Sequence, residues 1–299
     1  MSNKGLVSIA IPIYNGEKYI EETVLSVLNQ DYQNFELLCF IDGTKDGTAD
    51  ILRKYEDRLT IIEQENMGAS NTRNRGIMMG KGEYVLLLDQ DDVLEPTFLS
   101  KTVNEIVSSQ SWAVAVNGNL IDSGSNKIRG MYRFNKPTLK FKDLCYRNQL
   151  YATSQVLFNR QRIAELGGYD SKRAGIADDW DLSIRILQAG GSMVFLDECL
   201  MSYRLHDSNN SKNLPRMLTS ELNVIEQTIG DVSFAKAIKS YRHMNFSYRM
   251  AQSSHDLTTS RESLAQALKL NSKLLFNPRY YYCFFYIYLK GFRVLKVSE

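Results

Sequence analysis

The sequence predicts an α/β protein whose N-terminal part forms a doubly wound parallel sheet. Short, uniformly apolar runs alternate four times with segments whose apolar residues recur at helical spacing, and the connections are short. The fourth run, residues 84–88, leads directly into the carboxylates Asp89, Asp91 and Asp92. Because ligands bind where the strands of such a sheet end, we expect these acids to line a ligand crevice.

The expected elements follow one another along the chain. Strands are expected at residues 7–13, 35–41, 59–62, 84–88, 112–116, 193–196 and 200–205. Helices are expected at residues 20–28, in the segment that contains Leu52, in the segment that contains Arg73 and Arg75 and ends at Gly80, at 96–108, and from 178 to a left-handed glycine cap at Gly190-Gly191. Regular apolar patterning also resumes at residues 154–158 and again at 163–166, before Gly167-Gly168. Turn residues fill the loop 42–48 between the second strand and its helix.

Two segments depart from this alternation. Residues 117–151 are polar and rich in Gly and Asn, and we expect a substrate-shaping subdomain there. From about residue 214 the chain is expected to be helical and to form a separate appendage. We therefore predict a donor-binding half at 1–115, a catalytic and acceptor-binding half of the same domain at 116–213, and a helical appendage at 214–299.

Composition narrows the class of protein. The 299 residues include 43% hydrophobic and 23% charged side chains, as in ordinary soluble globular proteins. A net charge of +2 argues against a nucleic-acid-binding surface. No CxxC pair occurs, and Cys39 and Cys199 lie in apolar runs, which predicts buried, reduced thiols in a cytosolic protein. We expect no signal peptide and no membrane-spanning segment.

Asp89-Gln90-Asp91-Asp92 is the first acidic cluster. Three carboxylates this close repel one another unless a cation or hydrogen-bond donors neutralise them. An Asp-x-Asp pair suits a hard divalent cation whose other ligands are water and phosphate oxygens. The simpler explanation is a capped turn in which Asp92 starts the helix near Pro96.

Asp178-Asp179-Trp180-Asp181 is the second acidic cluster, at the expected start of a helix. Its macrodipole stabilises a carboxylate there, and plain helix capping is the simpler explanation. Capping does not need this many acids. Asp181 and Arg185 are spaced as an i,i+4 ion pair, and Trp180 suits a sugar pocket or the core.

Seven motifs in a fixed order, over roughly residues 6–211, resemble the inverting, nucleotide-sugar-dependent glycosyltransferases of family 2, which have the GT-A fold. They are Pro12-Ile13-Tyr14-Asn15, the helix residues Glu22, Ser26 and Gln30, the segment Phe35-Glu36 through Thr48, Asn66-Met67-Gly68 with Arg73-Asn74-Arg75-Gly76, Asp89-Gln90-Asp91-Asp92, Asp178-Asp179-Trp180-Asp181-Leu182 with Arg185, and Tyr203-Arg204-Leu205-His206 with Asn209-Asn210-Ser211. Two positions depart from the family pattern. Ile41 replaces the first of two paired acids and leaves Asp42, and Asp178 replaces the usual Glu.

The resemblance implies a GT-A, Rossmann-like mixed sheet flanked by helices, with a helical C-terminal appendage. It also implies a hexosyltransferase that uses Mn²⁺ or Mg²⁺ and a nucleotide diphosphate sugar, a UDP-sugar, to extend a bacterial polysaccharide or lipid-linked glycan with inversion. The site residues it implies are Asp179 as general base, Asp91, Asp89 and His206 as metal ligands, and Pro12, Tyr14, Asp42, Arg73 and Asp89 as donor-binding residues. For His206 and Tyr14 the simpler explanations are an ordinary surface or core histidine and a strand-end aromatic.

The C-terminal segment 279–296 is rich in Tyr and Phe and carries spaced basic residues. Such sequence suits the headgroup region of a bilayer, so peripheral contact with the inner face of the cell membrane is one expectation. Packing on the catalytic domain and a homodimer interface are the alternatives.

Three other functions fit the sequence less well. A nucleotidyltransferase would need a Gly-rich basic phosphate loop after the first strand, and Asn15-Gly16-Glu17-Lys18 is a poor one. A noncatalytic nucleotide-sugar-binding protein would not need acids in both clusters. A dinucleotide oxidoreductase is disfavoured because no G-x-G-x-x-G occurs.

Overall fold

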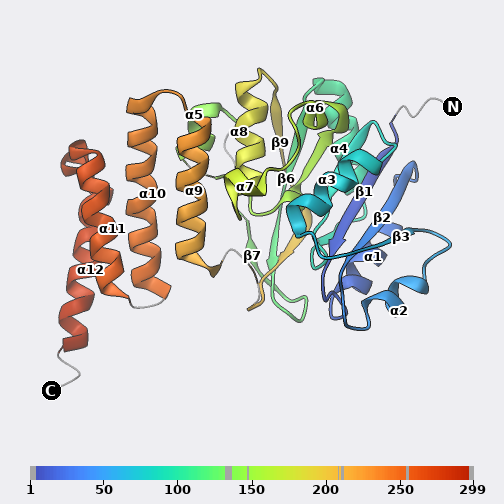
Figure 1. Ribbon diagram of the computed structural model, residues 1–299, viewed down its shortest axis with the longest axis horizontal. Helices are drawn as coiled ribbons and strands as arrows, with labels where there is room; N and C mark the ends of the chain where they lie inside the picture. Colours follow the sequence, from blue (N-terminus) through green and yellow to red (C-terminus); the bar gives the residue numbers. More distant parts are fainter. Residues whose placement is uncertain are drawn as a thin grey trace. The chain divides into compact units, whose positions relative to one another are not determined.

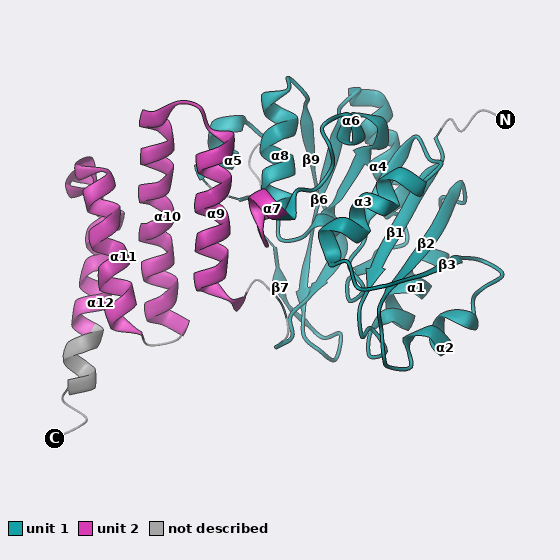
Figure 2. Cartoon of the chain, in the orientation of Figure 1, with its two compact units in different colours: residues 1–171, 178–209 teal, residues 172–177, 210–299 magenta. Residues whose placement is uncertain are grey.

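The structure of the chain, a computed structural model, describes residues 5–131, 137–146, 148–207, 209, 212–253 and 256–295, with side chains up to residue 289. The chain forms two compact units, residues 1–171 with 178–209, and residues 172–177 with 210–299 (Figure 2). Unit 1 combines a sheet with helices, and unit 2 is helical (Figure 1).

Unit 1 is built on a mixed sheet of nine strands among the described residues. They are β1 (Val7–Ile13), β2 (Phe35–Asp42), β3 (Thr60–Gln64), β4 (Tyr84–Leu87), β5 (Val93–Leu94), β6 (Ala113–Ile121), β7 (Lys127–Gly130), β8 (Val156–Asn159) and β9 (Met193–Arg204). Their order is β3-β2-β1-β4-β8-β6-β9-β5, with β7 paired to β6. Strands β1 to β4 are mutually parallel, and β8 runs antiparallel between β4 and β6. The predicted mixed α/β sheet is confirmed.

Helices cover both faces of this sheet. They are α1 (Ile20–Leu28), α2 (Thr48–Arg53), α3 (Ala69–Met79), α4 (Phe98–Ser109), α5 (Phe141–Tyr146), α6 (Arg160–Glu165) and α8 (Asp178–Gln188), with a 3-10 turn η1 (Thr153–Gln155). Successive strand residues point to opposite faces, so Ile9 and Ile11 of β1 join one core and Ala10 the other. Side chains of α1, α2 and α4 fill the first core, and those of α3, α6 and α8 fill the second.

Two expectations for the second half of unit 1 were wrong. Strand β6 does not end near residue 116 but continues to Ile121, where it turns back into β7. The strands expected at 193–196 and 200–205 are one strand, β9, whose register against β6 shifts at Asn117 and Gly118. Gly118 permits this irregularity because a Cβ atom there would lie 2.5 Å from the carbonyl oxygen of Met201.

Cys199 corrects the expectation of buried thiols. It lies opposite Asn117 in the irregular stretch of β9 and is exposed, whereas Cys39, Cys145 and Cys283 are buried. The strict alternation of inward and outward side chains is lost at such an irregularity, so an apolar run there does not imply burial.

Unit 2 contains α9 (Leu214–Thr228), α10 (Val232–Ser253), α11 (Leu257–Leu270), η3 (Ser272–Phe276) and α12 (Pro278–Leu295), together with most of α7 (Ser171–Ala174). Its own core includes Met244, Leu264, Cys283 and Ile287. The predicted helical C-terminal region is confirmed. Among the described residues, no helix has the length and apolar character needed to cross a membrane.

Candidate active site

The loops after β1, β2 and β4 meet at one edge of the sheet because these strands are parallel. The main-chain N–H of Gly16 donates to Oγ1 of Thr48 at 2.9 Å, which fastens the first loop to the second. The side chain of Gln90 accepts from the N–H of Tyr14 at 2.8 Å and donates to the carbonyl of Tyr14 at 3.1 Å. Gln90 therefore ties the acidic loop to the end of β1.

Polar side chains of α1, together with Gln30 just beyond its end, hold the acidic loop and the residues that follow it. Oγ1 of Thr23 donates to the carbonyl of Gln90 at 2.9 Å, and Oγ of Ser26 accepts from the N–H of Leu94 at 3.1 Å. Nε2 of Gln30 donates to the carbonyl of Glu95 at 2.8 Å. Ser26 and Gln30, which match the family's first helix, thus position the main chain just after the acids, and Thr23 positions the acidic loop itself.

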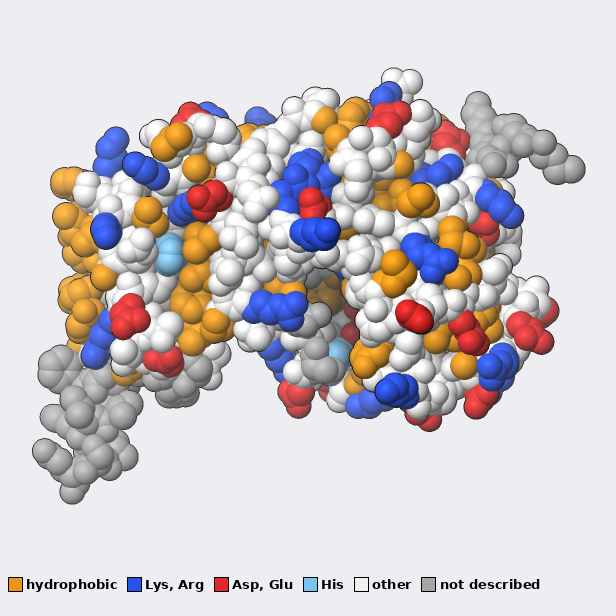
Figure 3. Space-filling view, viewed as in Figure 1, with side chains coloured by type: hydrophobic (Ala, Val, Ile, Leu, Met, Phe, Trp, Pro, Cys, Tyr) orange, Lys and Arg blue, Asp and Glu red, His pale blue; other side chains and the backbone are white. Residues whose placement is uncertain are grey.

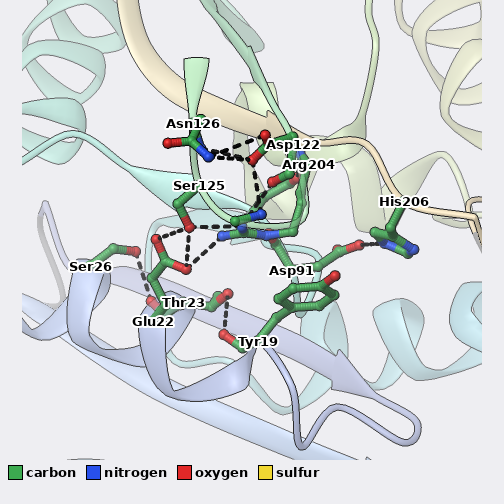
Figure 4. A network of polar contacts seen from close by, with 12 residues as sticks. Tyr19, Glu22, Thr23, Ser26, Asp91, Asp122, Ser125, Asn126, Arg204 and His206 are labelled. Atoms are coloured by element: carbon green, nitrogen blue, oxygen red, sulfur yellow. Dashed lines mark hydrogen bonds and ion pairs between the residues drawn. The ribbon is translucent and has the colours of Figure 1, made fainter. Parts of the chain in front are cut away.

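Asp91 and His206 face each other, with Oδ2 of Asp91 2.5 Å from Nε2 of His206 (Figure 4). Burial raises the pKa of Asp91, the nearby charge of Asp89 raises it further, and the hydrogen bond to His206 opposes the shift. The ring of Tyr19 lies 5.5 Å from the imidazole, centroid to centroid. The structure therefore brings together two of the three predicted metal ligands.

Arg204 is almost fully buried and connects four parts of unit 1 (Figure 4). Its Nε donates to the carbonyl oxygen of Asp91 at 2.8 Å, and its main-chain N–H donates to Oδ1 of Asp92 at 3.1 Å. Its Nη2 lies 2.7 Å from Oε2 of Glu22, and its Nη1 donates to Oγ of Ser125 at 2.8 Å. Arg204 therefore positions the main chain of Asp91.

Asp92 is not a helix cap. The helix after it begins at Phe98, and the Asp92 side chain is fully buried against Arg204. Burial raises the pKa of Asp92 well above its usual value, and the charges of Asp91 and Asp89 raise it further. The capped-turn explanation for this cluster is therefore wrong.

Arg73 joins the two acidic clusters. Its Nη2 lies 2.6 Å from Oδ1 of Asp89, and its Nη1 lies 3.4 Å from Oδ2 of Asp178. Burial alone would lower the pKa of Arg73, but the two carboxylates raise it above its usual range. The guanidinium therefore binds two carboxylates that lie 16 and 105 residues away from Arg73 in sequence. Its predicted contact with the nucleotide stays a prediction.

Asp178 and Asp179 lie in the first turn of α8, and both accept main-chain N–H groups there. Oδ1 of Asp178 accepts from Asp179 at 3.0 Å, and Oδ1 of Asp179 accepts from Trp180 at 2.6 Å. Oδ2 of Asp178 also accepts from Oγ of Ser70 at 2.5 Å. Burial raises the pKa of Asp179 to about 7, with a further contribution from the charge of Asp178. Helix capping is thus part of their role, but it does not account for this raised pKa.

Asp42 is buried at the end of β2 and anchors the next loop. Its carboxylate accepts from Nε2 of Gln64 at 2.7 Å and from the N–H groups of Met67 at 2.8 Å and Gly68 at 2.9 Å. A role toward the nucleotide stays a prediction beside this structural one. Of the other predicted donor-binding residues, Pro12 lies within β1 opposite Phe40, and Tyr14 is half exposed at the sheet edge.

Trp180 belongs to the core. It is fully buried, and its Nε1 donates to the carbonyl of Leu144 at 2.9 Å, so it does not line an open pocket. The predicted ion pair between Asp181 and Arg185 is present at 2.8 Å. Arg185 also donates to the carbonyl of Leu166 at 2.8 Å, so this pair braces the start of α8.

The sequence reasoning missed three residues at this edge. Oγ of Ser154 accepts from the N–H of Asp89 at 3.0 Å, Ser70 binds Asp178 as described, and the ring of Tyr169 lies 5.5 Å from the guanidinium carbon of Arg73. Ser70 follows the Asn66-Met67-Gly68 motif closely, which is a usable signal. Ser154 and Tyr169 carry no such signal.

A divalent cation fits this site only if phosphate oxygens of a bound nucleotide supply some of its ligands. In the described part of the chain, no group of three or more His, Cys, Asp or Glu side chains is placed to hold a metal ion. Asp91 and His206 nevertheless offer a carboxylate oxygen and an imidazole nitrogen side by side. Nucleotide-bound cations commonly use one or two protein ligands plus phosphate oxygens, so this pair fits. Asp89, the third predicted metal ligand, is instead paired with Arg73. In the segment after His206, the side chain of Asn209 accepts from the N–H of His206. Asn210 and Ser211 of the same motif lie outside the described residues.

Residues 8–166, more than half of the chain, match the family model described as glycosyl transferase family 2. The chain belongs to this family. It is therefore an enzyme, a glycosyltransferase of family 2, and the resemblance in its motifs is confirmed.

Curated relatives carry the same family name. The chain is 29% identical over 214 residues to the Bacillus subtilis protein named "Putative teichuronic acid biosynthesis glycosyltransferase TuaG", which covers 70% of this chain and 83% of that protein. It is 30% identical over 211 residues to an uncharacterised glycosyltransferase of Rickettsia typhi, covering 69% of this chain and 66% of that protein.

Solved structures share the GT-A fold of this glycosyltransferase. Staphylococcus aureus TarS in complex with UDP-GlcNAc superposes with a TM-score of 0.66 at 17% identity, covering 88% of this chain and 81% of that one. The mannosyltransferase PcManGT of Pyrobaculum calidifontis, in complex with GDP-Man and Mn²⁺, gives 0.62 at 16% identity, covering 98% and 88%. At such identity these likenesses show the fold.

Proposed function

We propose that this family 2 glycosyltransferase transfers a hexosyl group from a UDP-sugar to a hydroxyl group of a polysaccharide or lipid-linked glycan. The reaction proceeds with inversion and depends on a divalent cation. The observation that carries the proposal is the bridge by Arg73 between Asp89 and Asp178, which joins the cation-binding and base-bearing clusters at one sheet edge.

The donor side of the site is the edge formed by the loops after β1, β2 and β4. Asp91 and His206 would hold the cation, which stabilises the diphosphate leaving group when bound. Pro12, Tyr14, Asp42 and Asp89 are the proposed contacts of the nucleotide. In support, TarS and PcManGT, which share this fold, were solved with nucleotide sugars.

Asp179 is the proposed general base. Its pKa of about 7 lets it be ionised at neutral pH and still be basic enough to take the proton of a hydroxyl group as that group attacks. The acceptor oxygen forms a bond to the anomeric carbon while the bond from that carbon to the diphosphate oxygen breaks. A single displacement of this kind inverts the anomeric configuration.

The alternatives lack comparable support. The loop Asn15-Gly16-Glu17-Lys18 is the only stretch that the sequence offered to a nucleotidyltransferase as a phosphate loop. The N–H of Gly16 already donates to Thr48, and that of Glu17 donates to Asp46 at 3.0 Å. A noncatalytic binding protein gives no reason for a buried acid whose pKa is raised to about 7.

A donor screen tests the proposal. Thermal-shift measurements with UDP, GDP and CDP, each with and without Mn²⁺, should show stabilisation by UDP that requires the metal, because binding to the folded state raises the melting temperature. Hydrolysis or transfer from UDP-sugars should then follow the same metal requirement. No stabilisation by any nucleotide diphosphate in the presence of Mn²⁺ or Mg²⁺ would overturn the proposal.

A further inference from the structure

Helix α12 has two apolar faces, and the core of unit 2 uses only one of them. Tyr280, Cys283 and Ile287 are buried in that core. A second set on the same helix is 37–60% exposed: Tyr281, Tyr282, Phe285, Tyr288 and Leu289. Its members recur at i, i+4 and i+7 or i+8, the spacing of a single helix face. α12 therefore presents a continuous aromatic stripe that its own unit leaves uncovered.

The turn before α12 extends this stripe. Leu275 and Phe276 of η3 are both exposed, and the Phe276 side chain reaches 90% exposure. We call these two residues together with the exposed set on α12 the η3–α12 face. Figure 3 shows hydrophobic side chains gathered along this edge of unit 2, with Lys and Arg beside them.

The stretch of sequence that carries the η3–α12 face is basic. Between Glu262 and Glu299 the chain has no acidic residue and six basic ones, Lys269, Lys273, Arg279, Lys290, Arg293 and Lys296. Residues 210–299 contain 13 Lys and Arg against six Asp and Glu, whereas residues 1–209 contain 23 against 28. The guanidinium of Arg261 lies 4.9 Å from the ring centre of Tyr288, at the border of the face. The near-neutral chain therefore has a strongly basic C-terminal part.

We propose that the η3–α12 face docks unit 2 on an anionic membrane surface. Aromatic rings with polar tips settle at the level of the lipid headgroups, and nearby Lys and Arg are attracted to anionic lipid. Among the described residues no helix can cross a bilayer, so α12 would lie along the surface. This proposal deepens the proposed function, on which it rests for the link to a lipid-linked acceptor.

Charge complementarity selects the membrane over a second copy of the chain. Symmetric pairing of two η3–α12 faces would bring two basic segments together, and residues 263–298 supply no acid to offset them. Packing inside the unit is already provided by Tyr280, Cys283 and Ile287 on the other side of α12. An anionic lipid surface satisfies both the apolar stripe and its basic border.

Vesicle flotation of the full chain tests the proposal without donor or acceptor present. We expect binding to phosphatidylcholine vesicles that contain about one-third phosphatidylglycerol, little binding to pure phosphatidylcholine, and release by salt. The double substitution Phe276→Ser and Phe285→Ser should weaken binding about tenfold or more. Val232→Ser is the matched control, because Val232 is an exposed apolar residue of the same unit outside the face.

A second variant tests the electrostatic half of the proposal. Lys269→Glu with Lys273→Glu changes two exposed side chains and should weaken binding to anionic vesicles. The melting temperature should fall only slightly, because each lysine lies in the last turn of its helix and interacts with the helix dipole there. Equal binding to neutral vesicles, no binding at all, or full binding by the serine variant would each overturn the proposal. So would light scattering that shows a dimer converted to a monomer by the serine substitutions.

The outcome is separable from that of the proposed function. Vesicle binding involves no turnover, so its absence leaves transfer to a water-soluble acceptor intact. Conversely, if the enzyme binds vesicles but shows no metal-dependent affinity for nucleotide diphosphates, the membrane-docking proposal stands and the proposed donor is wrong.

Discussion

Arg204 and Glu22 form an ion pair in which Nη2 lies 2.7 Å from Oε2, although they are 182 residues apart in sequence. The pair joins helix α1 to the end of β9, two residues before His206. The same guanidinium donates to the carbonyl oxygen of Asp91. The buried guanidinium of Arg204 therefore holds the main chain of Asp91 and fixes the end of β9, from which His206 follows two residues later.

Arg204→Lys should weaken the site without unfolding the protein. Lysine keeps the charge but has a single side-chain nitrogen, whereas Asp91, Ser125 and Glu22 are bound by three different nitrogens of the guanidinium. We expect the Kd for Mn²⁺ in the presence of UDP to rise about 10- to 100-fold, as for residues that orient metal ligands. Glu22→Gln should have a smaller effect because Glu22 is partly exposed. Calorimetry checks both; a melting temperature lowered with an unchanged metal affinity would make Arg204 purely structural.

Asp179→Asn should retain donor affinity and lose transfer. The amide is similar in size but cannot accept the proton of the acceptor hydroxyl, so we expect kcat to fall about 100- to 10,000-fold. Calorimetry with UDP and Mn²⁺ should give the wild-type Kd. Asp50→Asn, a change of an exposed acid on α2, is the control. Wild-type turnover by the Asp179 variant would exclude Asp179 as the base.

The rate of transfer should depend on the ionisation of Asp179. Because burial raises its pKa to about 7, kcat should increase with pH below 7 and level off above it. Asp178→Asn removes a neighbouring negative charge and should move the midpoint to lower pH. A pH–rate profile with the same midpoint in both proteins would contradict this coupling.

The same ionisation affects stability. The folded-state pKa of Asp179 lies above its unfolded value, so between about pH 4 and pH 7 the folded protein holds a proton that the unfolded chain releases. The contribution of Asp179 to stability is therefore greatest at low pH and declines as pH rises through that window. Asp179→Asn removes the decline, so its melting temperature should rise relative to that of the wild type between about pH 4 and pH 7, and the difference should level off above pH 7.

Asp91→Asn tests the cation. If Asp91 holds the metal, UDP affinity should no longer respond to Mn²⁺, while the weak metal-free affinity stays the same. Calorimetric titrations of UDP with Mn²⁺ and with EDTA measure this difference directly. A metal-dependent Kd like that of the wild type would remove Asp91 from the ligand set.

Trp180→Phe separates a core role from a sugar-pocket role. The substitution removes the hydrogen bond to Leu144 and leaves a small cavity, so we expect a loss of about 1–3 kcal/mol in the free energy of unfolding. The KM for the donor should not change. A raised KM with unchanged stability would place Trp180 at the substrate instead.

Much of unit 1 could be predicted because its signals are local. Strands β1, β2 and β4 are short apolar runs that end in turn or acidic residues, and Asp91, His206 and Asp179 lie in recognisable motifs. Contacts that depend on folded distance could not be predicted. The bonds of Asp42 to the loop at Met67 and of Ser154 to Asp89 join segments that pattern alone leaves independent.

Gln90 separates the two acids of the Asp-x-Asp motif, and its amide grips both polar main-chain atoms of Tyr14. Gln90 therefore fixes the position of Tyr14, whose ring is proposed to lie beside the nucleobase. A substitution of Tyr14 changes the ring but leaves the main chain at this position held by Gln90. Replacing Gln90 by a side chain without an amide releases that main chain, so we expect base preference to change while the acids stay in place.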